Sequence, residues 1–546
     1  MKNKSTLSLS SMFSLKWILI LATVLRLAFL NSNPISLNWD EVSMGYSAYS
    51  LAETGKDEWG ETLPIFFRSY GEWKSAVYIY FVVPFVKVLG LNAWAVRLPS
   101  ALAGIAAVYL VYLLVKQLYN SKVGLFAALF MAITPWHLVL SRPAFEANLS
   151  LTLVILGIYG FVRAWQSRWH YSGLALSLIG FGLAPHTYNS SKIVVPFIII
   201  YLIIVTSFYR QLQKLLVYFV VLGFFALPII LNMFSGVSQH RYTQVGVTTD
   251  QTSLTAFYAV RDTLPFPSTV NKLIINKGTF FIYKVADNWF SYLNPAFLFI
   301  EAGDHKQHHV PYRGILYLTE AVFLLFGLIA LFQKRSILYT LPIVLIVLGF
   351  LPGALTRDTE HVLRSILAIP GFIILLALGA NYLTLQKPQY LPALYLLLTL
   401  EFLIFCFSYF IWYPKFTARD WQFGHQEVAT YLKANENKYE EIIMTKWFGE
   451  PQLFLAFYNQ WDPTWYQTEN QKLIKYETEG KLWLDQLEEY RFGKYTFRYL
   501  NWHKEDKLSS KLYIGKWDDF YIDSNYQATI KYPDGTVAFQ LVEGEL

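Results

Sequence analysis

Two adjacent carboxylates, Asp40 and Glu41, directly follow the first apolar run of the chain, within Asn38-Trp39-Asp40-Glu41. At a membrane surface such a pair could supply a general base that removes the proton of an incoming hydroxyl group. The same residues are also typical of the first turn of a helix, where Asn38 or Asp40 would cap backbone N–H groups and acidic side chains favour the helix dipole. These residues alone leave capping and catalysis equally open.

Further polar side chains that could serve an anionic substrate recur between the later apolar runs. Transfer from a lipid phosphate requires cations that bind the phosphate and a carboxylate that deprotonates the acceptor hydroxyl. Each basic residue taken alone is also typical of a helix-end anchor, because long basic side chains extend to the membrane interface. The candidates for binding a donor phosphate or sugar are Lys74, Arg142, His186, Tyr188, Lys192 and Arg364.

The run Asp304-His305-Lys306-Gln307-His308-His309 is the one candidate for a metal site. In a helix, His305 and His309 would share a face and could both bind one ion. Gly303 and Pro311 instead indicate a loop, which removes that spacing argument. We therefore expect no metal ion and no other cofactor.

The composition places the chain in a membrane. Of its 546 residues, 54% are hydrophobic and only 15% are charged, which is beyond the usage of ordinary soluble proteins. The single cysteine, Cys406, lies within an apolar run, so we expect neither a disulfide framework nor a cysteine-based zinc site. The net charge of +7 is modest, and its basic residues lie mostly in short loops, as topology determinants do. A nucleic-acid partner is therefore not expected.

About eleven apolar runs are predicted to cross the bilayer, each approaching about 20 residues. A twelfth run, Ala76–Leu89, carries Pro84 and Lys87 near its end. The predicted spans are Leu15–Leu30, Leu98–Leu118, Val123–Leu140, Asn148–Trp165, Tyr171–Ala184, Ile193–Phe208, Leu215–Phe234, Gly314–Phe332, Ile337–Leu355, Val362–Leu383 and Leu391–Trp412.

Charge asymmetry predicts how these spans are oriented. If the basic loops are cytoplasmic, every loop alternates correctly, provided that Ala76–Leu89 does not cross and is a re-entrant or interfacial helix. The N-terminus is then cytoplasmic, the first span is uncleaved, and the tail from Tyr413 lies outside a plasma membrane crossed many times. The basic loops that support this orientation are Lys116/Lys122, Arg163/Arg168, Arg210/Lys214, Lys334/Arg335 and Lys387.

Two domains are predicted. Residues 1–412 form the membrane domain, with the large outer loops 31–96 and 235–313 building its site, and residues 413–546 form a small extracytoplasmic mixed α/β domain. Apolar patches at Leu273–Val285 and Trp289–Phe299 could lie on the membrane. In the tail, Pro533-Asp534-Gly535 predicts a hairpin turn. The other predicted tail elements are a helix at Gln426–Lys433 and strands at Glu441–Thr445, Tyr495–Tyr499, Lys511–Ile514, Gln527–Tyr532 and Val537–Val542.

Several short motifs, in this order along the chain, resemble the bacterial protein O-mannosyltransferase-like and aminoarabinose-transferase-like membrane glycosyltransferases of the glycosyltransferase C (GT-C) superfamily. The resemblance runs from Leu15 to about Trp412. Its carriers are Asn38-Trp39-Asp40-Glu41, Trp73-Lys74-Ser75, Arg97-Leu98-Pro99-Ser100-Ala101-Leu102-Ala103-Gly104, Pro135-Trp136-His137 with Ser141-Arg142, Ser191-Lys192 with Pro196, Tyr292-Leu293-Asn294-Pro295 with Phe297-Leu298-Phe299, Gly303-Asp304, and His361 with Arg364-Ser365.

The resemblance implies a GT-C fold and an inverting transfer from a polyprenyl-phosphate sugar to a hydroxyl acceptor (protein, lipid or wall glycan) on the outer face of the membrane. Asp40 would be the general base, Glu41 would orient the acceptor or the base, and Lys74 would contact the phosphate. Two features depart from the family: Ser75-Ala76 replaces a pair of prolines, and Lys192 stands where many relatives have arginine, which makes it a point charge. The resemblance calls for no metal.

Two other classes of function compete with an enzyme. A transporter or flippase of a lipid-linked substrate would favour charged residues within spans and broken helices, and a non-catalytic scaffold would only display the tail. The predicted spans are mostly free of charge, which favours chemistry at one membrane surface. The exceptions are Arg26, Glu320 and Glu401.

Overall fold

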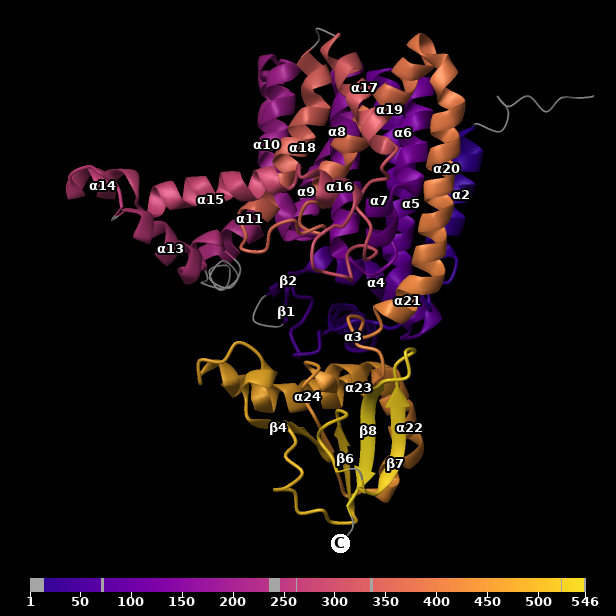
Figure 1. The fold of residues 1–546 in the computed structure, drawn as a ribbon, viewed down its shortest axis with the longest axis vertical. Helices are drawn as coiled ribbons and strands as arrows, with labels where there is room; N and C mark the ends of the chain where they lie inside the picture. Colours follow the sequence, from indigo (N-terminus) through magenta and orange to yellow (C-terminus); the bar gives the residue numbers. More distant parts are fainter. Residues whose placement is uncertain are drawn as a thin grey trace, which may run out of the picture. The chain divides into compact units, whose positions relative to one another are not determined.

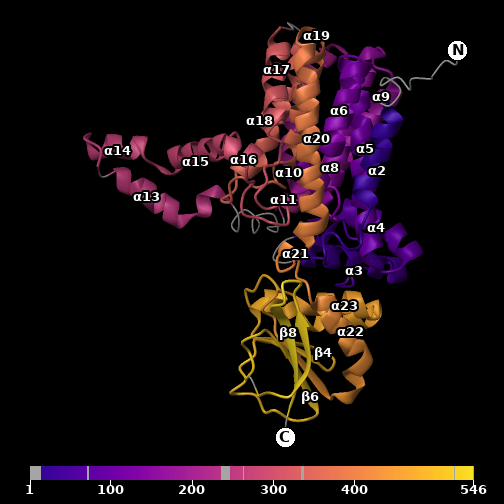
Figure 2. The ribbon, with the colours of Figure 1, turned by 45° about the vertical axis from the view of Figure 1, so that its right-hand side comes forward.

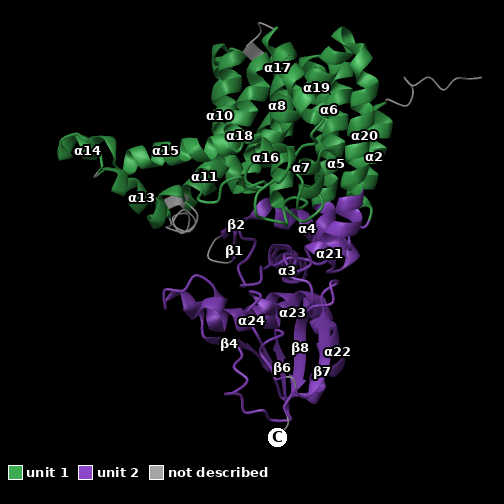
Figure 3. Cartoon of the chain, in the orientation of Figure 1, with its two compact units in different colours: residues 1–28, 100–406 green, residues 29–99, 407–546 purple. Residues whose placement is uncertain are grey.

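The computed structural model describes residues 14–69, 73–234, 246–261, 263–333, 337–521 and 523–544. The chain forms two compact units, each built from two separate stretches (Figure 3). Unit 1 comprises Met1–Ala28 and Ser100–Cys406, and unit 2 comprises Phe29–Pro99 and Phe407–Leu546. Residues 31–96, which were predicted as an outer loop and are called the outer segment below, thus group with the tail, whereas the predicted division at residue 412 leaves them with the membrane helices.

Unit 1 is a bundle of apolar helices, and α5, α6, α8, α17, α19 and α20 run alongside one another in Figures 1 and 2. Within it, α8 packs on α9, and α19 packs on α6, α17 and α18. The helices are α2 (Leu15–Leu27), α5 (Ala93–Leu118, which begins in unit 2), α6 (Ser121–Ile133), α7 (Pro135–Leu140), α8 (Glu146–Gln166), α9 (Tyr171–Leu183), α10 (Asn189–Val205), α11 (Leu212–Phe234), α17 (Glu320–Phe332), α18 (Leu341–Ala354), α19 (Ile369–Gln386) and α20 (Leu391–Phe407).

The described residues include five helices that are long and apolar enough to cross a membrane, so the chain is a multi-pass membrane protein. The predicted count of about eleven spans is not confirmed. The five are Ala93–Leu118, Glu146–Gln166, Leu212–Asn232, Ile366–Gln386 and Pro388–Phe416, and shorter apolar helices include Ser121–Ile133, Asn189–Val205, Glu320–Phe332 and Leu341–Ala354.

Several of the predicted spans are not continuous helices, and two of them bear on the packing of the bundle. Val123–Leu140 breaks after Ile133, because a proline at position 135 disfavours helical backbone at the residue before it. Gly314–Phe332 is helical only from Glu320. The two breaks are joined by a backbone hydrogen bond, in which the Trp136 N–H donates to the Ile315 carbonyl at 3.1 Å.

The predicted outer loop 235–313 contains an arm of helices that extends away from the bundle in both views (Figures 1 and 2). The arm consists of α13 (Gln251–Arg261), α14 (Ser268–Ile274) and α15 (Lys277–Ser291), and the short α16 (Pro295–Phe299) follows it. Exposed apolar side chains on the arm include Leu273, Ile282 and Phe290. That these helices lie on a membrane surface stays a prediction.

Unit 2 combines the outer segment with the tail. Helix α3 (Trp39–Thr54) packs against α4 (Ala76–Leu89), α23 (Pro451–Asn459) and α24 (Pro463–Leu473). A short hairpin of β1 (Phe66–Arg68) and β2 (Trp73–Ser75) precedes α4. The 14 residues of α4 span only about 21 Å, which is short for a hydrocarbon core of about 30 Å. That α4 does not cross the bilayer stays a prediction.

The tail carries a six-stranded sheet in the order β4-β5-β3-β6-β8-β7. Strand β3 pairs in parallel with β5 and β6, the other pairs are antiparallel, and the predicted hairpin is the β7–β8 pair. The predicted helix near Gln426 is α22 (His425–Asn435), whereas β4, α23 and α24 were not predicted. The strands are β3 (Glu441–Met444), β4 (Glu489–Phe492), β5 (Tyr495–Arg498), β6 (Lys511–Gly515), β7 (Tyr526–Lys531) and β8 (Val537–Glu543).

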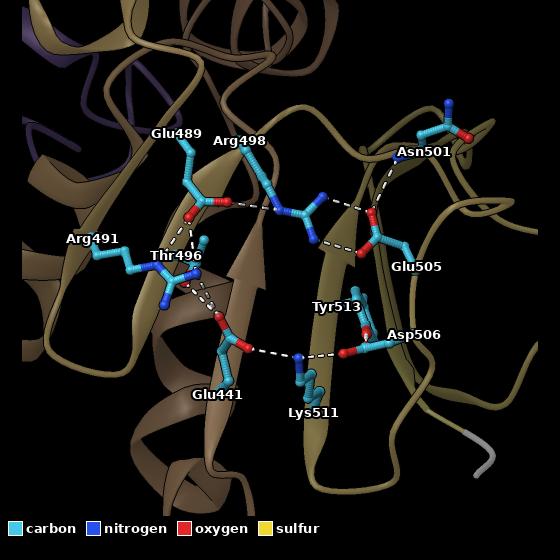
Figure 4. A network of polar contacts seen from close by, with 10 residues as sticks. All are labelled: Glu441, Glu489, Arg491, Thr496, Arg498, Asn501, Glu505, Asp506, Lys511 and Tyr513. Atoms are coloured by element: carbon cyan, nitrogen blue, oxygen red, sulfur yellow. Dashed lines mark hydrogen bonds and ion pairs between the residues drawn. The ribbon is translucent and has the colours of Figure 1, made fainter.

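A network of charged side chains joins four of these strands (Figure 4). Glu441 on the central β3 accepts from Lys511 on β6 at 2.9 Å and lies 3.7 Å from Arg491 on β4. Arg498 on β5 donates two bonds of 2.6 Å to Glu505. These pairs are partly buried, with the Glu505 side chain only 4% exposed, and they link the neighbouring strands β4, β5, β3 and β6.

Helices α17 and α19 approach each other closely through glycine. A Cβ atom on Gly379 would lie 1.8 Å from the Phe323 carbonyl oxygen, and one on Gly327 would lie 2.1 Å from the Leu375 carbonyl oxygen. Small residues at such contacts let helix backbones pack together where the surrounding lipid offers no hydrophobic driving force.

We predict that Gly379→Ala lowers the thermal-unfolding midpoint of the detergent-purified protein by several degrees, because overpacking costs about 1–3 kcal/mol. Gly223→Ala in α11 is the matched control, since nothing lies within 4 Å of the position that its new Cβ atom would take. The control should unfold at or above the wild-type midpoint, because alanine favours helices. Equal midpoints for the two variants would contradict the close approach.

Candidate functional site

Helix α3 begins with a reciprocal cap that decides between the two interpretations of its first turn. The Asn38 side chain accepts the Glu41 N–H at 2.9 Å, and a Glu41 carboxylate oxygen accepts the Asn38 N–H at 3.2 Å. Such a capping box satisfies two backbone donors at the helix start. Asn38 is therefore the cap, and Asp40 is not needed for it.

The Glu41 carboxylate forms its hydrogen bonds within the protein interior. Its two oxygens accept from Arg97 at 2.8 and 2.9 Å, and both side chains are fully buried. Arg97 also donates to the carbonyls of Leu30, at 3.1 Å, and Pro34, at 2.8 Å. The pair thus fixes the start of α3 to the chain that precedes it, which suits a positioning role for Glu41.

Asp40 faces the other way and forms an ion pair with Lys74. The family resemblance implied a role for both residues, as the general base and the phosphate contact. The Asp40 carboxylate lies 2.7 Å from the Lys74 ammonium, and its side chain is 41% exposed while that of Lys74 is 8% exposed. Lys74 is the middle residue of β2, opposite Phe67 in the hairpin. The structure therefore brings together a solvent-accessible carboxylate and a buried cation from separate parts of the outer segment.

A small cavity opens within unit 2, and its mouth and interior together enclose about 350 Å³. Glu58, Arg68 and Ser69 of the outer segment line it together with residues of α3, α23 and α24. Its aromatic walls are Trp59, Tyr466, Tyr476 and Trp483, and Glu450 supplies a second carboxylate.

Several buried polar atoms in this cavity have no hydrogen-bond partner among the described residues. They are Oε2 of Glu58, Nε of Arg68, Oγ of Ser69 and Oδ1 of Asn470. Unpaired buried polar atoms are costly, so a polar ligand or water would be favoured here. The cavity was not predicted, because no sequence motif links residues 58 and 470.

The pKa of Glu58 is raised to about 8, chiefly by burial and also by the neighbouring Asp57, while the Lys74 ammonium opposes the change. Burial also raises the pKa of Asp57 to about 6. Lys74 therefore faces Glu58 as well as Asp40, and the cavity holds a carboxyl group that stays protonated near neutral pH.

In unit 1, Arg142 acts as a helix-end anchor. Its guanidinium donates to the carbonyls of Leu25, Arg26 and Ala28, at 2.6, 3.1 and 2.7 Å, and the residue is fully buried. These carbonyls end α2, where a cation also favours the helix dipole. Because it is fully buried, Arg142 differs from the interfacial anchor that the sequence offered as the alternative.

Three other candidates lie together near the start of α10. Ser190 donates to the Arg364 carbonyl at 3.2 Å, and Lys192 donates to Asn189 at 2.6 Å. Burial raises the pKa of Tyr188, and the Arg364 cation opposes this change. Arg364 donates to Thr356 at 2.8 Å and to Asp358 at 3.2 Å.

His186 is turned to α11, where its Nε2 hydrogen-bonds to the Phe225 carbonyl at 2.6 Å.

Part of the chain matches a family of known proteins. Residues 74–233 match the dolichyl-phosphate-mannose-protein mannosyltransferase family, so the match begins at Lys74 and does not include Asp40 or Arg364. The predicted resemblance is confirmed. The putative mannosyltransferases YycA and YkcB of Bacillus subtilis (strain 168) are 29% and 28% identical over 131 and 119 residues, which is 24% and 21% of this chain. The chain matches only 19% and 16% of the length of these relatives.

The fold is similar to that of a solved structure. ArnT from Cupriavidus metallidurans in the apo state superposes with a TM-score of 0.55 and 10% identity, covering 98% of each chain. At this identity the similarity shows the fold and not the activity. The predicted architecture of apolar helices with a small sheet-containing domain is therefore confirmed in its broad form.

We predict that Glu58→Gln stabilises the protein above neutral pH. The folded state raises this pKa from 4.5 to about 8, so between these values the folded protein holds a proton that the unfolded chain releases. Wild-type stability therefore falls as pH rises from about 4.5 to 8, and the uncharged variant escapes this loss.

The measurement is the thermal-unfolding midpoint of both proteins at pH 5 and pH 8. The advantage of Glu58→Gln should be small at pH 5 and largest at pH 8, whereas Glu53→Gln on the exposed side of α3 should follow the wild type at both. A pH-independent difference would contradict the raised pKa.

Proposed function

We propose that this protein is a membrane glycosyltransferase that moves a sugar from a polyprenyl-phosphate-linked donor to a hydroxyl acceptor on the outer face of the membrane. The observation that carries the proposal is the Asp40–Lys74 pair, an accessible carboxylate 2.7 Å from a buried ammonium group. The matching family, whose match begins at Lys74, is named for dolichyl-phosphate mannose, a donor of this class.

The proposed reaction is a single displacement with inversion. The acceptor oxygen attacks the anomeric carbon on the face opposite the phosphate, and its proton passes to the Asp40 carboxylate. The bond between the anomeric carbon and the phosphate oxygen breaks, and its electron pair leaves with the polyprenyl phosphate. The products are the glycosylated acceptor and the lipid phosphate, so no further reactant is needed.

One catalytic carboxylate is sufficient for this chemistry. The leaving phosphate is an anion of low basicity, so it needs electrostatic stabilisation more than protonation. Inverting glycoside hydrolysis instead needs two carboxyl groups about 6.5–9.5 Å apart, because there the leaving group must be protonated. Glu41 is therefore assigned a positioning role, through its bonds to Asn38 and Arg97.

Lys74 is proposed to link the base and the leaving group. In the free enzyme the Lys74 ammonium pairs with Asp40. A bound donor phosphate would compete for this ammonium group, which would leave carboxylate lone pairs of Asp40 free to accept the proton of the acceptor hydroxyl. Binding of the donor by Lys192, Tyr188 and Arg364 stays a prediction, as does that by His186. Arg142 is assigned to anchoring α2, because its guanidinium already donates to three carbonyls there.

We predict that Asp40→Asn reduces turnover at least about 100-fold, because a positioned general base contributes typically about 10²–10⁴-fold. The measurement is transfer from a synthetic polyprenyl-phosphate sugar by the detergent-purified protein, with the unfolding midpoint as a check on folding. Asp523→Asn, an exposed change in the tail, is the control. Near-normal turnover of Asp40→Asn would refute the mechanism, and no turnover by the wild type would instead favour a flippase or a scaffold.

We further predict that Lys74→Gln raises the KM for the donor by about tenfold or more, because a hydrogen bond to a charged group contributes about 1.5–3 kcal/mol. The KM for the hydroxyl acceptor should change little. Lys56→Gln, an exposed change in the same segment, is the control. If Lys74→Gln affected both substrates equally, the lysine would support the site rather than bind phosphate.

A further inference from the structure

Three histidines from two loops of unit 1 lie together, outside the residues assigned above. His305 and His308 belong to the loop after α16, and His361 belongs to the loop before α19. Their ring centres are 5.5 Å (305–308), 4.6 Å (305–361) and 4.9 Å (308–361) apart. One ring nitrogen from each residue lies within 4.8 Å of those of the other two.

The backbone holds the two loops against each other at this point. Gly303 has a φ of +72°, and a Cβ there would lie 2.7 Å from the Glu360 carbonyl oxygen, so the chain passes where a side chain would collide. The His361 N–H donates to the Tyr292 hydroxyl at 3.0 Å. In the other loop, the His308 N–H donates to the His305 carbonyl at 2.9 Å and closes a turn.

The three rings combine burial with access from solvent. His308 and His361 are buried, and His305 is exposed. The His308 Nδ1 has no hydrogen-bond partner among the described residues, and the ring meets Phe145 edge to face.

Charges around the cluster are partly balanced. The Arg364 guanidinium interacts electrostatically with His308 and His361. It also forms an ion pair with Asp358 at 3.2 Å. The Asp304 carboxylate interacts electrostatically with the neighbouring His309 and with Glu360. Two carboxylates, those of Asp304 and Glu360, therefore border the cluster. An added divalent cation would therefore meet both signs of charge.

We propose that His305, His308 and His361 bind a divalent transition metal of the zinc class, each through one ring nitrogen. Zinc–nitrogen bonds of about 2.0–2.1 Å place tetrahedral ligand atoms about 3.4 Å apart, so the three nitrogens, which lie within 4.8 Å of one another, would move closer together on binding. Imidazole ligands suit zinc, copper and nickel, whereas calcium and magnesium prefer oxygen. A water molecule would complete the four ligands. The metal would join the two loops and so position Arg364, three residues after His361.

The site differs from the one that the sequence suggested. The pair His305 and His309 would need a helix, and the segment is a loop, as Gly303 and Pro311 indicated. The third ligand is instead His361, which lies more than fifty positions further along the chain. No spacing rule within the histidine run predicts it.

The test uses the full chain, purified in detergent with a tag that contains no histidine and stripped with a chelator. Titration with Co²⁺, a spectroscopic substitute for zinc, should give the visible absorption of a tetrahedral site at one equivalent per chain. Zn²⁺ should displace that spectrum and raise the unfolding midpoint, as expected for a ligand that binds only the folded protein.

His308→Ala and His361→Ala should abolish the Co²⁺ spectrum and the Zn²⁺-dependent stabilisation. Because these two residues are buried, the exposed His305→Ala is the variant that tests binding without a risk to folding, and it should weaken Co²⁺ at least tenfold. His309→Ala, which changes a neighbouring histidine outside the cluster, should bind like the wild type. No Co²⁺ binding by the wild type, full binding by His305→Ala, or loss of binding in His309→Ala would each overturn the assignment.

Discussion

The buried ion pair between Glu41 and Arg97 is the interaction on which the outer segment depends. Both side chains are fully buried, and removing two charges from water costs several kcal/mol each unless hydrogen bonds compensate. The compensation is extensive, because Arg97 also donates to the carbonyls of Leu30, Pro34 and Ser36. Loss of either partner would leave the other charged and buried, which typically costs about 3–5 kcal/mol.

The same ion pair explains why two adjacent carboxylates have different environments. Consecutive residues on a helix point about 100° apart, so when Glu41 faces the interior its neighbour Asp40 is turned toward the surface. Glu41 is held by Arg97 and by the Asn38 N–H, whereas Asp40 keeps an exposed carboxylate beside Lys74. Capping and the proposed catalysis are therefore divided between the two residues rather than exclusive of each other.

The charged residues within the apolar runs have a structural explanation that does not require transport. Arg26 donates to the carbonyls of Met131 and Ala132, next to the break between α6 and α7. Glu320 accepts from the Thr134 hydroxyl and the Tyr317 N–H, and Glu401 accepts from the Thr319 N–H before α17. Backbone groups freed where a helix breaks must be satisfied within the protein, because lipid offers no hydrogen bonds. The side chains of Arg26, Glu320 and Glu401 supply these hydrogen bonds.

The sequence by itself determined many of the elements of this protein and the identity of its candidate base. Apolar runs predicted where helices lie, alternation and turn residues predicted the β7–β8 hairpin, and Asn38 or Asp40 was predicted as a possible helix cap. Asp40 and Lys74 were both named from the sequence, although their 2.7 Å contact was not. These features are local, so spacing along the chain carries them.

Only the tertiary structure decided which polar groups meet. Arg97 as the partner of Glu41, the break that links Trp136 to Ile315, the carbonyls that bind Arg142, and the cavity around Glu58 all join residues that are far apart in the chain. The grouping of His361 with His305 and His308 is of the same kind. Such contacts depend on how helices and loops pack in space, and periodicity along a single chain holds no information about which distant residues packing brings together.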